Sequence, residues 1–324
     1  MQYRKMGKWG LKLSCLGLGS FLTIGYKTDQ ETSRLLVRRA YEAGINFIDT
    51  ANGYNRGGAE EALRPLLAEY PRSDLVVLTK VWAPMGPGPN DRGLSAKHIK
   101  EQCDASLKRL GMDYVDIYMC HRPDPDTPLE ETIRAMDDLA RAGKILYWAA
   151  SEWPATLMLE ANAIAKEMGA LPISCSEPRY NLLFRYPEQN LFDTTIQLGI
   201  GNVTFSPLAH GLLTGKYEPG QEAPSGTRAA DPDQNAVMMG MYWSEENKRK
   251  GKKLQSIASA MGTTAATLSL AWCLRHPAVT SVILGCSKVS QLEENLQAAE
   301  LELGDDVLAA LDELYPPPPP VPAA

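Results

Sequence analysis

The sequence has few residues that bind metals, and no arrangement of them indicates a metal site. None of its 6 cysteines belongs to a C-x-x-C pair, and most stand inside apolar stretches, which predicts buried and reduced thiols. Its 4 histidines lack the spacing of zinc ligands. We therefore expect no metal centre.

The sequence also lacks an excess of positive charge and a long apolar run. Lys and Arg total 33 against 39 Asp and Glu, and the net charge of -6 argues against a nucleic-acid-binding surface. No uninterrupted apolar stretch is long enough to span a bilayer, and no N-terminal segment has the pattern of a signal peptide. These absences predict a soluble cytoplasmic protein without membrane insertion.

What the sequence does contain is a repeated unit of helix, glycine and strand. Residues 32–43 have a helical apolar face, Gly44 follows, and the apolar stretch 45–49 predicts a strand. A glycine at this point ends the helix in the left-handed conformation and turns the chain back toward the sheet. The same order recurs with helices at 95–110, 129–142 and 188–198, with Gly111, Gly143 and Gly199, and with strands at 114–119, 145–149 and 203–205.

Further apolar stretches bring the expected number of strands to about eight. They lie near Cys15 and at 75–79, 173–176 and 282–284. Continuous apolar strands that alternate with helices are typical of a parallel sheet covered on both faces. The fold class is therefore predicted as α/β, a (β/α)8 TIM barrel, with a single domain over residues 1–314. Two short strands at 2–6 and 11–15 predict an N-terminal β-hairpin that closes the bottom of the barrel.

Three segments break this repeat. Residues 214–243 are rich in Gly, Pro and polar residues and lack a helical period, so we expect a long lid loop. Residues 315–324 include five consecutive prolines and predict an extended, solvated tail, with a role in binding a partner left open. Leu16–Ser20 resembles the start of a dinucleotide-binding G-x-G-x-x-G, but Leu22 occupies the third glycine position and no helix follows. We interpret it as a tight first strand.

Polar residues stand at the ends of three consecutive predicted strands. Asp49 ends the second strand and Tyr54 follows it, Lys80 ends the third strand, and His121 ends the fourth. The carboxyl ends of barrel strands meet at one mouth, so we expect these four side chains to lie together. Each alone has an ordinary structural interpretation, as a solvated strand end, a rim histidine or a packed tyrosine. Their joint position favours an active site.

The four side chains suit proton donation to a carbonyl group. A tyrosine hydroxyl is a poor acid at neutral pH, and a nearby ammonium lowers its pKa by stabilising the phenolate. An aspartate holds such a lysine charged and in place. We therefore expect Tyr54 to donate the proton, Lys80 and Asp49 to tune it, and His121 to orient a carbonyl that receives hydride from another group.

These positions resemble the catalytic tetrad of the aldo-keto reductases. The similar phrases are Ile-Asp-Thr-Ala-x-x-Tyr, Thr-Lys and His-Arg-Pro-Asp-Pro, and the resemblance runs from Tyr3 to about Glu302. The segments that begin at Gly93 and Arg122 are similar to the branch that contains the potassium-channel β-subunits. Animal members of that branch often carry Asn where this chain has His121, which favours an active reductase. The resemblance implies NADP(H), preferably NADPH, bound across the barrel mouth without a Rossmann fold.

The resemblance also assigns cofactor-binding positions, Asp49 among them. It places Gly19 and Ser20 in the loop under the nicotinamide and Ser151 against its carboxamide. The segment around the pyrophosphate contains Ser206, Pro207, Leu208, Gly211 and Lys216, with Arg228 offered to the phosphates, and the adenosine site contains Gly285, Ser287, Gln291, Glu294 and Asn295. Without the resemblance, the stretch at Gly285 is simply a strand-to-helix connection and Arg228 is a solvated loop charge.

Three further cofactor-binding positions depart from the family pattern. Glu177 replaces a Gln that both donates to and accepts from the carboxamide, whereas an ionised Glu only accepts. We expect either a bias toward the oxidised, cationic cofactor or a Glu177 that stays protonated. Glu152 stands where Asn or a basic residue is usual, and Phe205 replaces an aromatic, commonly Trp, that stacks on the nicotinamide. These changes affect cofactor affinity more than reaction type.

Aromatic residues near the strand ends are the candidates for substrate contacts. They are Phe21, Tyr26, Trp82 and Trp153, and each is about equally consistent with ordinary rim packing. Together they predict a moderately apolar pocket for an aldehyde or a ketone. The expected function is an NADPH-dependent carbonyl reductase. The alternatives are a channel-β-like nucleotide-binding regulatory subunit and a sugar dehydrogenase that works oxidatively, and analogy with the family suggests a homo-oligomer, a tetramer.

Overall fold

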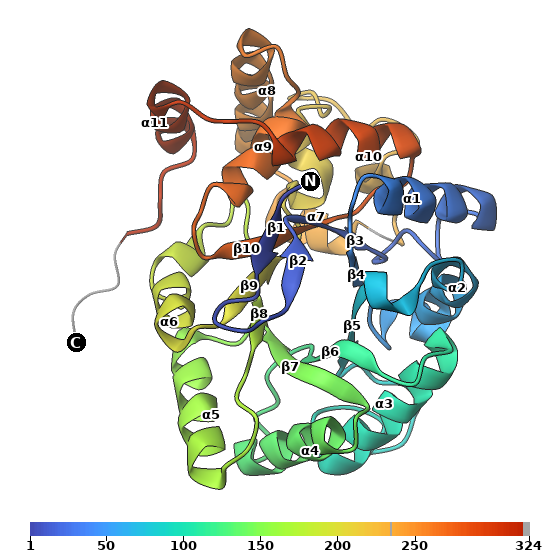
Figure 1. The fold of residues 1–324 in the computed structure, drawn as a ribbon. Coiled ribbons are helices and arrows are strands. Elements are labelled where there is room, and N and C mark those ends of the chain that lie inside the picture. Colours follow the sequence, from blue (N-terminus) through green and yellow to red (C-terminus); the bar gives the residue numbers. More distant parts are fainter. Residues whose placement is uncertain (234, 320–324) are drawn as a thin grey trace.

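The centre of the molecule is a closed barrel of eight parallel strands (Figure 1). The computed structural model describes residues 1–233 and 235–319. All eight strands neighbour one another in chain order, and the last strand also pairs with the first and so closes the barrel. The strands are β3 (Leu16–Gly19), β4 (Phe47–Asp49), β5 (Val76–Val81), β6 (Val115–Cys120), β7 (Ile145–Ser151), β8 (Cys175–Glu177), β9 (Gly201–Thr204) and β10 (Val279–Leu284). The predicted (β/α)8 barrel is confirmed.

Helices form a ring around the barrel (Figure 1). Gly111 and Gly199 end their helices in the left-handed conformation, as expected, and Ser95 caps the helix that follows it by accepting a hydrogen bond from the His98 amide. The helices around the barrel are α1 (Gln30–Glu42), α2 (Gly58–Leu67), α3 (Ala96–Leu110), α4 (Leu129–Arg141), α5 (Ala155–Met168), α6 (Leu191–Leu198), α8 (Glu245–Ala260), α9 (Ala265–Leu274) and α10 (Val289–Leu296), and α11 (Asp305–Leu314) follows them.

The apolar side chains form two layers, one inside the barrel and one between the strands and the helices. The inner layer includes Phe47, Leu78, Ile117 and Val203, all buried. The outer layer joins the opposite faces of the same strands to the helices. Strands buried on both faces explain why the sequence shows continuous apolar runs rather than alternation.

A hairpin of β1 (Tyr3–Lys5) and β2 (Lys12–Ser14) closes the bottom of the barrel, as predicted. Its Met6 and Leu13 are fully buried in the inner layer. Gly7 in the turn has φ +58°, and a Cβ there would lie 2.2 Å from the Gly199 carbonyl oxygen. A side chain therefore has no room at this position.

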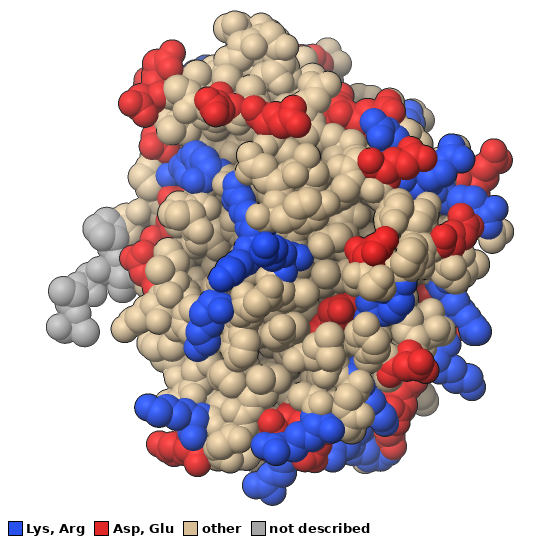
Figure 2. All heavy atoms as spheres, in the orientation of Figure 1, with Lys and Arg blue, Asp and Glu red and all other residues tan. Residues whose placement is uncertain are grey.

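Figure 2 shows this lower face of the molecule. Basic side chains cross the hairpin, where Lys5, Lys8 and Lys12 are exposed, and both signs of charge are mixed over the outer helices. No single helix of the described chain is long and apolar enough to cross a membrane; the bent pair α8 and α9 passes that test only jointly, by length and composition.

The segment at 214–243 differs from the loop that we predicted. It contains a short helix, α7 (Ala236–Met241). The sequence concealed it because α7 is apolar on several sides and exposes Val237, Met239 and Met241, so no helical period marks a buried face. Tyr217 and Tyr242 are buried at the two ends of the segment and anchor it to the barrel.

The start of the proline-rich segment is also attached. Tyr315 is buried, and Arg185 donates a hydrogen bond to its carbonyl and pairs with Asp312 on α11. Gln189 donates to the Pro319 carbonyl at 2.6 Å. The solvated tail that we predicted from residue 315 therefore does not begin at Tyr315. Its last part, residues 320–324, lies outside the described residues.

Candidate active site

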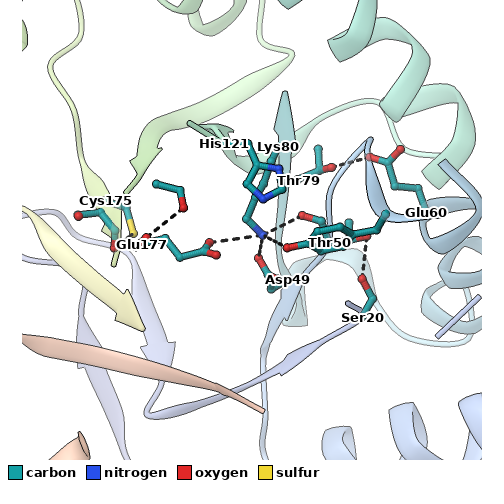
Figure 3. Close-up of polar contacts among 12 residues, drawn as sticks. Ser20, Asp49, Thr50, Glu60, Thr79, Lys80, His121, Cys175 and Glu177 are labelled. Atoms are coloured by element: carbon teal, nitrogen blue, oxygen red, sulfur yellow. Dashed lines mark hydrogen bonds and ion pairs between the residues drawn. The ribbon is translucent and has the colours of Figure 1, made fainter. Parts of the chain in front are cut away.

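Lys80 is the centre of the site, and its side chain is fully buried at the mouth of the barrel (Figure 3). The ammonium donates a short hydrogen bond to Asp49, a second to the Thr50 carbonyl at 3.1 Å, and a third to the Tyr54 hydroxyl at 3.2 Å. Parallel pairing aligns Asp49 on β4 with Leu78 on β5, so the acid and the lysine reach the same mouth. The structure thus brings three of the four predicted catalytic residues into direct contact.

A second carboxyl group faces the same ammonium. Glu177 ends β8, is 2% exposed, and has Oε2 3.4 Å from Lys80 Nζ. Burial opposes the charge of Lys80, the charge of Asp49 is the largest cause acting against burial, and the pKa of Lys80 lies above its ordinary value. Lys80 therefore stays charged at neutral pH.

Tyr54 keeps its proton more firmly than the sequence suggested. Burial is the largest influence and raises the pKa of its hydroxyl; Lys80 lowers that pKa, whereas Asp49 raises it. We expected the ammonium to dominate and to lower the pKa of Tyr54, and that net direction is wrong for the protein alone. The contact at 3.2 Å remains available to stabilise a phenolate once the proton has left.

His121 completes the group as a neutral imidazole. It follows β6, and its ring lies edge-on to the Tyr54 ring with 5.6 Å between the centroids. Burial, and then the charges of Lys80 and Arg122, lower the pKa of His121 well below its usual range. A neutral ring has one nitrogen that donates a hydrogen bond, which suits it to hold a carbonyl oxygen near Tyr54.

A buried network that the sequence did not indicate supports the strand of Lys80. Thr79 donates to Glu60 on α2, and Arg109 on α3 pairs with the other oxygen of the same carboxylate at 2.6 Å. Glu60 is fully buried, so it needs both partners. The signal in the sequence is weak because the three residues are far apart in the chain.

The residues assigned to the nicotinamide lie around this centre. Ser20 follows β3, its amide donates to the Asp49 carbonyl, and its hydroxyl donates to Thr50 at 2.9 Å. A Cβ on Gly19 would lie 2.6 Å from the Ile283 side chain, so the close packing of β3 on β10 requires glycine. Ser151 ends β7, directly beside Glu177, and donates to the carbonyl of Glu177 at 3.0 Å.

Two of the departures from the family pattern are linked by an arginine that we had not singled out. Glu152 accepts a hydrogen bond from the Arg179 amide at 2.8 Å and pairs with its guanidinium at 3.4 Å. The Arg179 guanidinium in turn lies 5.7 Å from the centre of the Phe205 ring. Glu152 is therefore paired with Arg179, and the Arg179 guanidinium lies over the ring of Phe205.

Several loops at the mouth have strained backbone. Positive φ values outside glycine occur after β3, β4, β5, β7 and β9. Such conformations persist where the surroundings hold them, and they cluster at functional sites. The residues are Leu22, Asn55, Arg56, Trp82, Glu152, Ser206, Ala209 and His210.

Lys216 and Arg228 lie beyond β9, in and after the segment assigned to the pyrophosphate, and Lys288 follows β10. Burial, followed by the charges of Arg228 and Lys288, lowers the pKa of Lys216. Within residues 1–233 and 235–319, none of these three cations forms an ion pair with a carboxylate. Arg228 instead contacts the His210 ring at 3.2 Å, and burial and Arg228 lower the pKa of His210 to about 4. Lys216 and Lys288 are exposed and Arg228 is half-buried. Cations at the mouth without acidic partners fit the phosphates of a dinucleotide.

The rest of that segment is held in place by its own hydrogen bonds and by burial. Ser206 accepts a hydrogen bond from Asn181 through its carbonyl, Pro207 is buried, and the Gly211 amide donates to the Leu208 carbonyl. Gly211 has φ +100°, and a Cβ there would lie 3.3 Å from the Lys216 ammonium. The glycine thus leaves space at the cation.

Only some of the residues assigned to the adenosine site are free to contact a ligand. Gly285 is exposed with open space where a Cβ would stand, and Ser287 bonds Gln291 through both its amide and its hydroxyl. Glu294 accepts a hydrogen bond from Thr264, and Asn295 is buried and donates to Cys286. The structure therefore brings Gly285 and Ser287 to the surface, whereas Glu294 and Asn295 are engaged in internal contacts.

The predicted substrate residues separate into two groups. Phe21 and Tyr26 are exposed and line a cavity of about 210 Å³ with Tyr54, and Trp82 after β5 is 36% exposed. Trp153 is 1% exposed and packs edge-on against Trp148. Its placement at the mouth was wrong, because the chain after β7 turns this ring into the core. No cluster of three or more metal-ligating side chains occurs in the described parts of the chain.

Comparison with known proteins agrees with the barrel fold. The model of the aldo/keto reductase family matches residues 15–316. A protein of Arabidopsis thaliana named probable voltage-gated potassium channel subunit beta is 42% identical over 306 residues, which are 93% of this chain and 92% of that protein. A protein of Oryza sativa subsp. japonica with the same name is 40% identical over 305 residues, with the same coverage. The chain therefore belongs to the aldo/keto reductase family.

Proposed function

We propose that the protein is an NADP(H)-dependent oxidoreductase that reduces an aldehyde or a ketone to an alcohol. The observation that carries the proposal is the chain of contacts from Asp49 through Lys80 to Tyr54, with neutral His121 beside the Tyr54 ring. These residues end or follow three neighbouring strands, and all face one mouth. Membership in the family supports the same class of reaction.

Each residue has one role in this proposal. His121 donates a hydrogen bond that orients the carbonyl oxygen, and Tyr54 donates the proton to that oxygen. Lys80 stabilises the Tyr54 phenolate that remains, and Asp49 holds Lys80 charged and in place. The nicotinamide of the cofactor, when bound, supplies the hydride to the carbonyl carbon.

The side chains present fit such a cofactor. Lys216, Arg228 and Lys288 offer positive charge without acidic partners in the described chain, which suits the phosphates. Glu177 carries a buried oxygen, Oε2, without a hydrogen-bond partner in the described residues, which suits a polar group of the nicotinamide. Phe205 offers a ring face for stacking.

The substrate is proposed to be an aldehyde or ketone with an apolar or aromatic side. Phe21 and Tyr26 line the cavity that reaches Tyr54, and the Phe21 ring lies 4.9 Å from the Tyr54 ring, centroid to centroid. A carbonyl oxygen at Tyr54 would therefore carry its substituent along these rings.

A second candidate function is a nucleotide-binding regulatory subunit. It is favoured by the names of the two plant relatives, which describe probable subunits of voltage-gated potassium channels. The complete set of Asp49, Tyr54, Lys80 and His121 favours catalysis instead. A sugar dehydrogenase that works oxidatively is a third candidate, which an ionised Glu177 beside an oxidised cofactor would favour.

A steady-state assay tests the proposal. The full-length protein, NADPH and 4-nitrobenzaldehyde should give continuous loss of NADPH absorbance, with an equal amount of alcohol formed. A protein that binds NADPH but consumes none of it with a panel of aldehydes and ketones would favour the regulatory candidate.

A further inference from the structure

We propose that Glu177 couples cofactor binding to a proton: it is a carboxylic acid in the free protein and with the reduced cofactor, and it releases its proton when the oxidised cofactor binds. The inference rests on the proposed function, because it concerns the same cofactor. It makes Glu177 a residue that discriminates between the two redox states and thereby sets the direction in which the site works.

The ammonium of Lys80 faces two carboxyl groups, those of Asp49 and Glu177. Lys80 donates a hydrogen bond to Asp49 but only approaches Glu177, at 3.4 Å, without a hydrogen bond to its Oε2. Glu177 and Asp49 are both 2% exposed, so solvent does not screen a second negative charge. The ammonium neutralises the acid that it bonds, and the other acid holds a proton.

The remaining neighbours of Glu177 agree with this assignment. Burial is the main cause that raises the pKa of Glu177 to about 8, with Lys80 and then Asp49 acting in opposite directions. Arg122, after β6, is the other charged side chain that acts on this carboxyl group. Among the described residues, the acid without the hydrogen bond is therefore the one that titrates near neutral pH.

Asp49 is the other acid of this centre, and burial raises its pKa as well, although the charge and hydrogen bond of Lys80 lower it. The remaining ionisable groups around Glu177 are shifted away from neutral pH. Burial raises the pKa of Cys175 on the same strand, and the pKa values of Lys80 and Tyr54 also lie above their ordinary values. The pKa of His121 lies well below its usual range. A proton exchanged near neutral pH at this centre therefore belongs to the two carboxyl groups, and Glu177 is the one whose Oε2 lacks a hydrogen bond from the ammonium.

The chemistry links this proton to the redox state of the ligand. The reduced nicotinamide ring is neutral and the oxidised ring is cationic. A protonated Glu177 donates a hydrogen bond as the amide of a glutamine would, whereas an ionised Glu177 offers a negative charge to the cationic ring. Binding of NADP+ therefore lowers the pKa of Glu177, and the proton leaves to solvent.

Calorimetric titration tests the inference. NADP+ and NADPH are titrated separately into the full-length protein at pH 7.5, in phosphate and in Tris, whose different heats of ionisation reveal the protons released. We expect the binding of NADP+ to release up to about one proton more than the binding of NADPH. Both cofactors carry the same phosphates, so protons exchanged by the phosphates cancel when the two values are subtracted. In Glu177→Gln the difference should vanish, while in the exposed control Glu160→Gln it should persist.

A pH series on the wild type supplies a second measurement that needs no variant. The ratio of the Kd for NADP+ to the Kd for NADPH should fall by up to about tenfold per pH unit between pH 7 and 8, and level off above that range. Equal proton release with both cofactors, or an unchanged difference in Glu177→Gln, would overturn the inference. Failure to bind either nucleotide would instead contradict the proposed function.

Discussion

Replacing Glu177 by Gln should stabilise the protein without cofactor, and increasingly so as the pH rises from about 5 to 8. The wild-type carboxyl group has a pKa of about 8 in the folded protein against an ordinary value of 4.5. Between these values the folded chain holds a proton that the unfolded chain has lost, so the wild type loses stability as the pH rises. Below pH 4.5 Glu177 is protonated in both the folded and the unfolded chain, so it costs no stability. Above pH 8 it is ionised in both, so the loss of unfolding free energy no longer changes with pH.

The magnitude follows from the size of this shift. Each pKa unit is worth about 1.4 kcal/mol, so the gain in unfolding free energy of Glu177→Gln should be about 3 kcal/mol at pH 7 and about 4 kcal/mol at pH 8. Urea unfolding of both proteins at pH 5, 6, 7 and 8 measures it. A difference that does not change with pH, or a variant less stable than the wild type at pH 8, would refute the reasoning. The exposed control Glu160→Gln should show no such trend.

The basic group and the hairpin turn give two further predictions. Arg228→Ala should weaken NADPH binding about 10- to 100-fold, because a charged partner of the phosphates is lost; fluorescence titration at low and high salt measures it, and an unchanged affinity would remove Arg228 from the cofactor site. Gly7→Ala should lower the unfolding free energy by more than about 2 kcal/mol, since φ is +58° and the new Cβ meets the Gly199 carbonyl at 2.2 Å. Gly143→Ala, with φ +71° but no atom within 4 Å, should lose only about 1 kcal/mol, and equal losses in urea unfolding would contradict the steric argument.

The barrel could be predicted because its signals are local. A helix, a glycine at its end and an apolar strand lie within a few residues of one another, and the glycines at 111, 143 and 199 have the left-handed conformation that the pattern requires. The positions of Asp49, Lys80 and His121 at successive strand ends followed from the same repeat. The short helix α7 was missed because Val237, Met239 and Met241 are exposed rather than set on a buried face.

The rest of the site could not be predicted because it depends on contacts between distant segments. Nothing in the sequence links Glu152 to Arg179 or Thr79 to Glu60, and Trp153 gives no sign that its ring enters the core. The pKa of Tyr54 was misjudged for a similar reason. The sequence indicated one ammonium near the hydroxyl, whereas burial of the hydroxyl outweighs that ammonium in the folded chain.

The measurement that tests the account most directly compares wild type with Tyr54→Phe. We predict that NADPH-dependent reduction of 4-nitrobenzaldehyde falls by at least about 100-fold, because the proton donor is lost, while the Kd for NADPH stays the same, since the phenyl ring keeps its place beside Phe21 and His121. A variant that binds NADPH normally and reduces the aldehyde at the wild-type rate would show that Tyr54 is not the acid and would contradict the central claim.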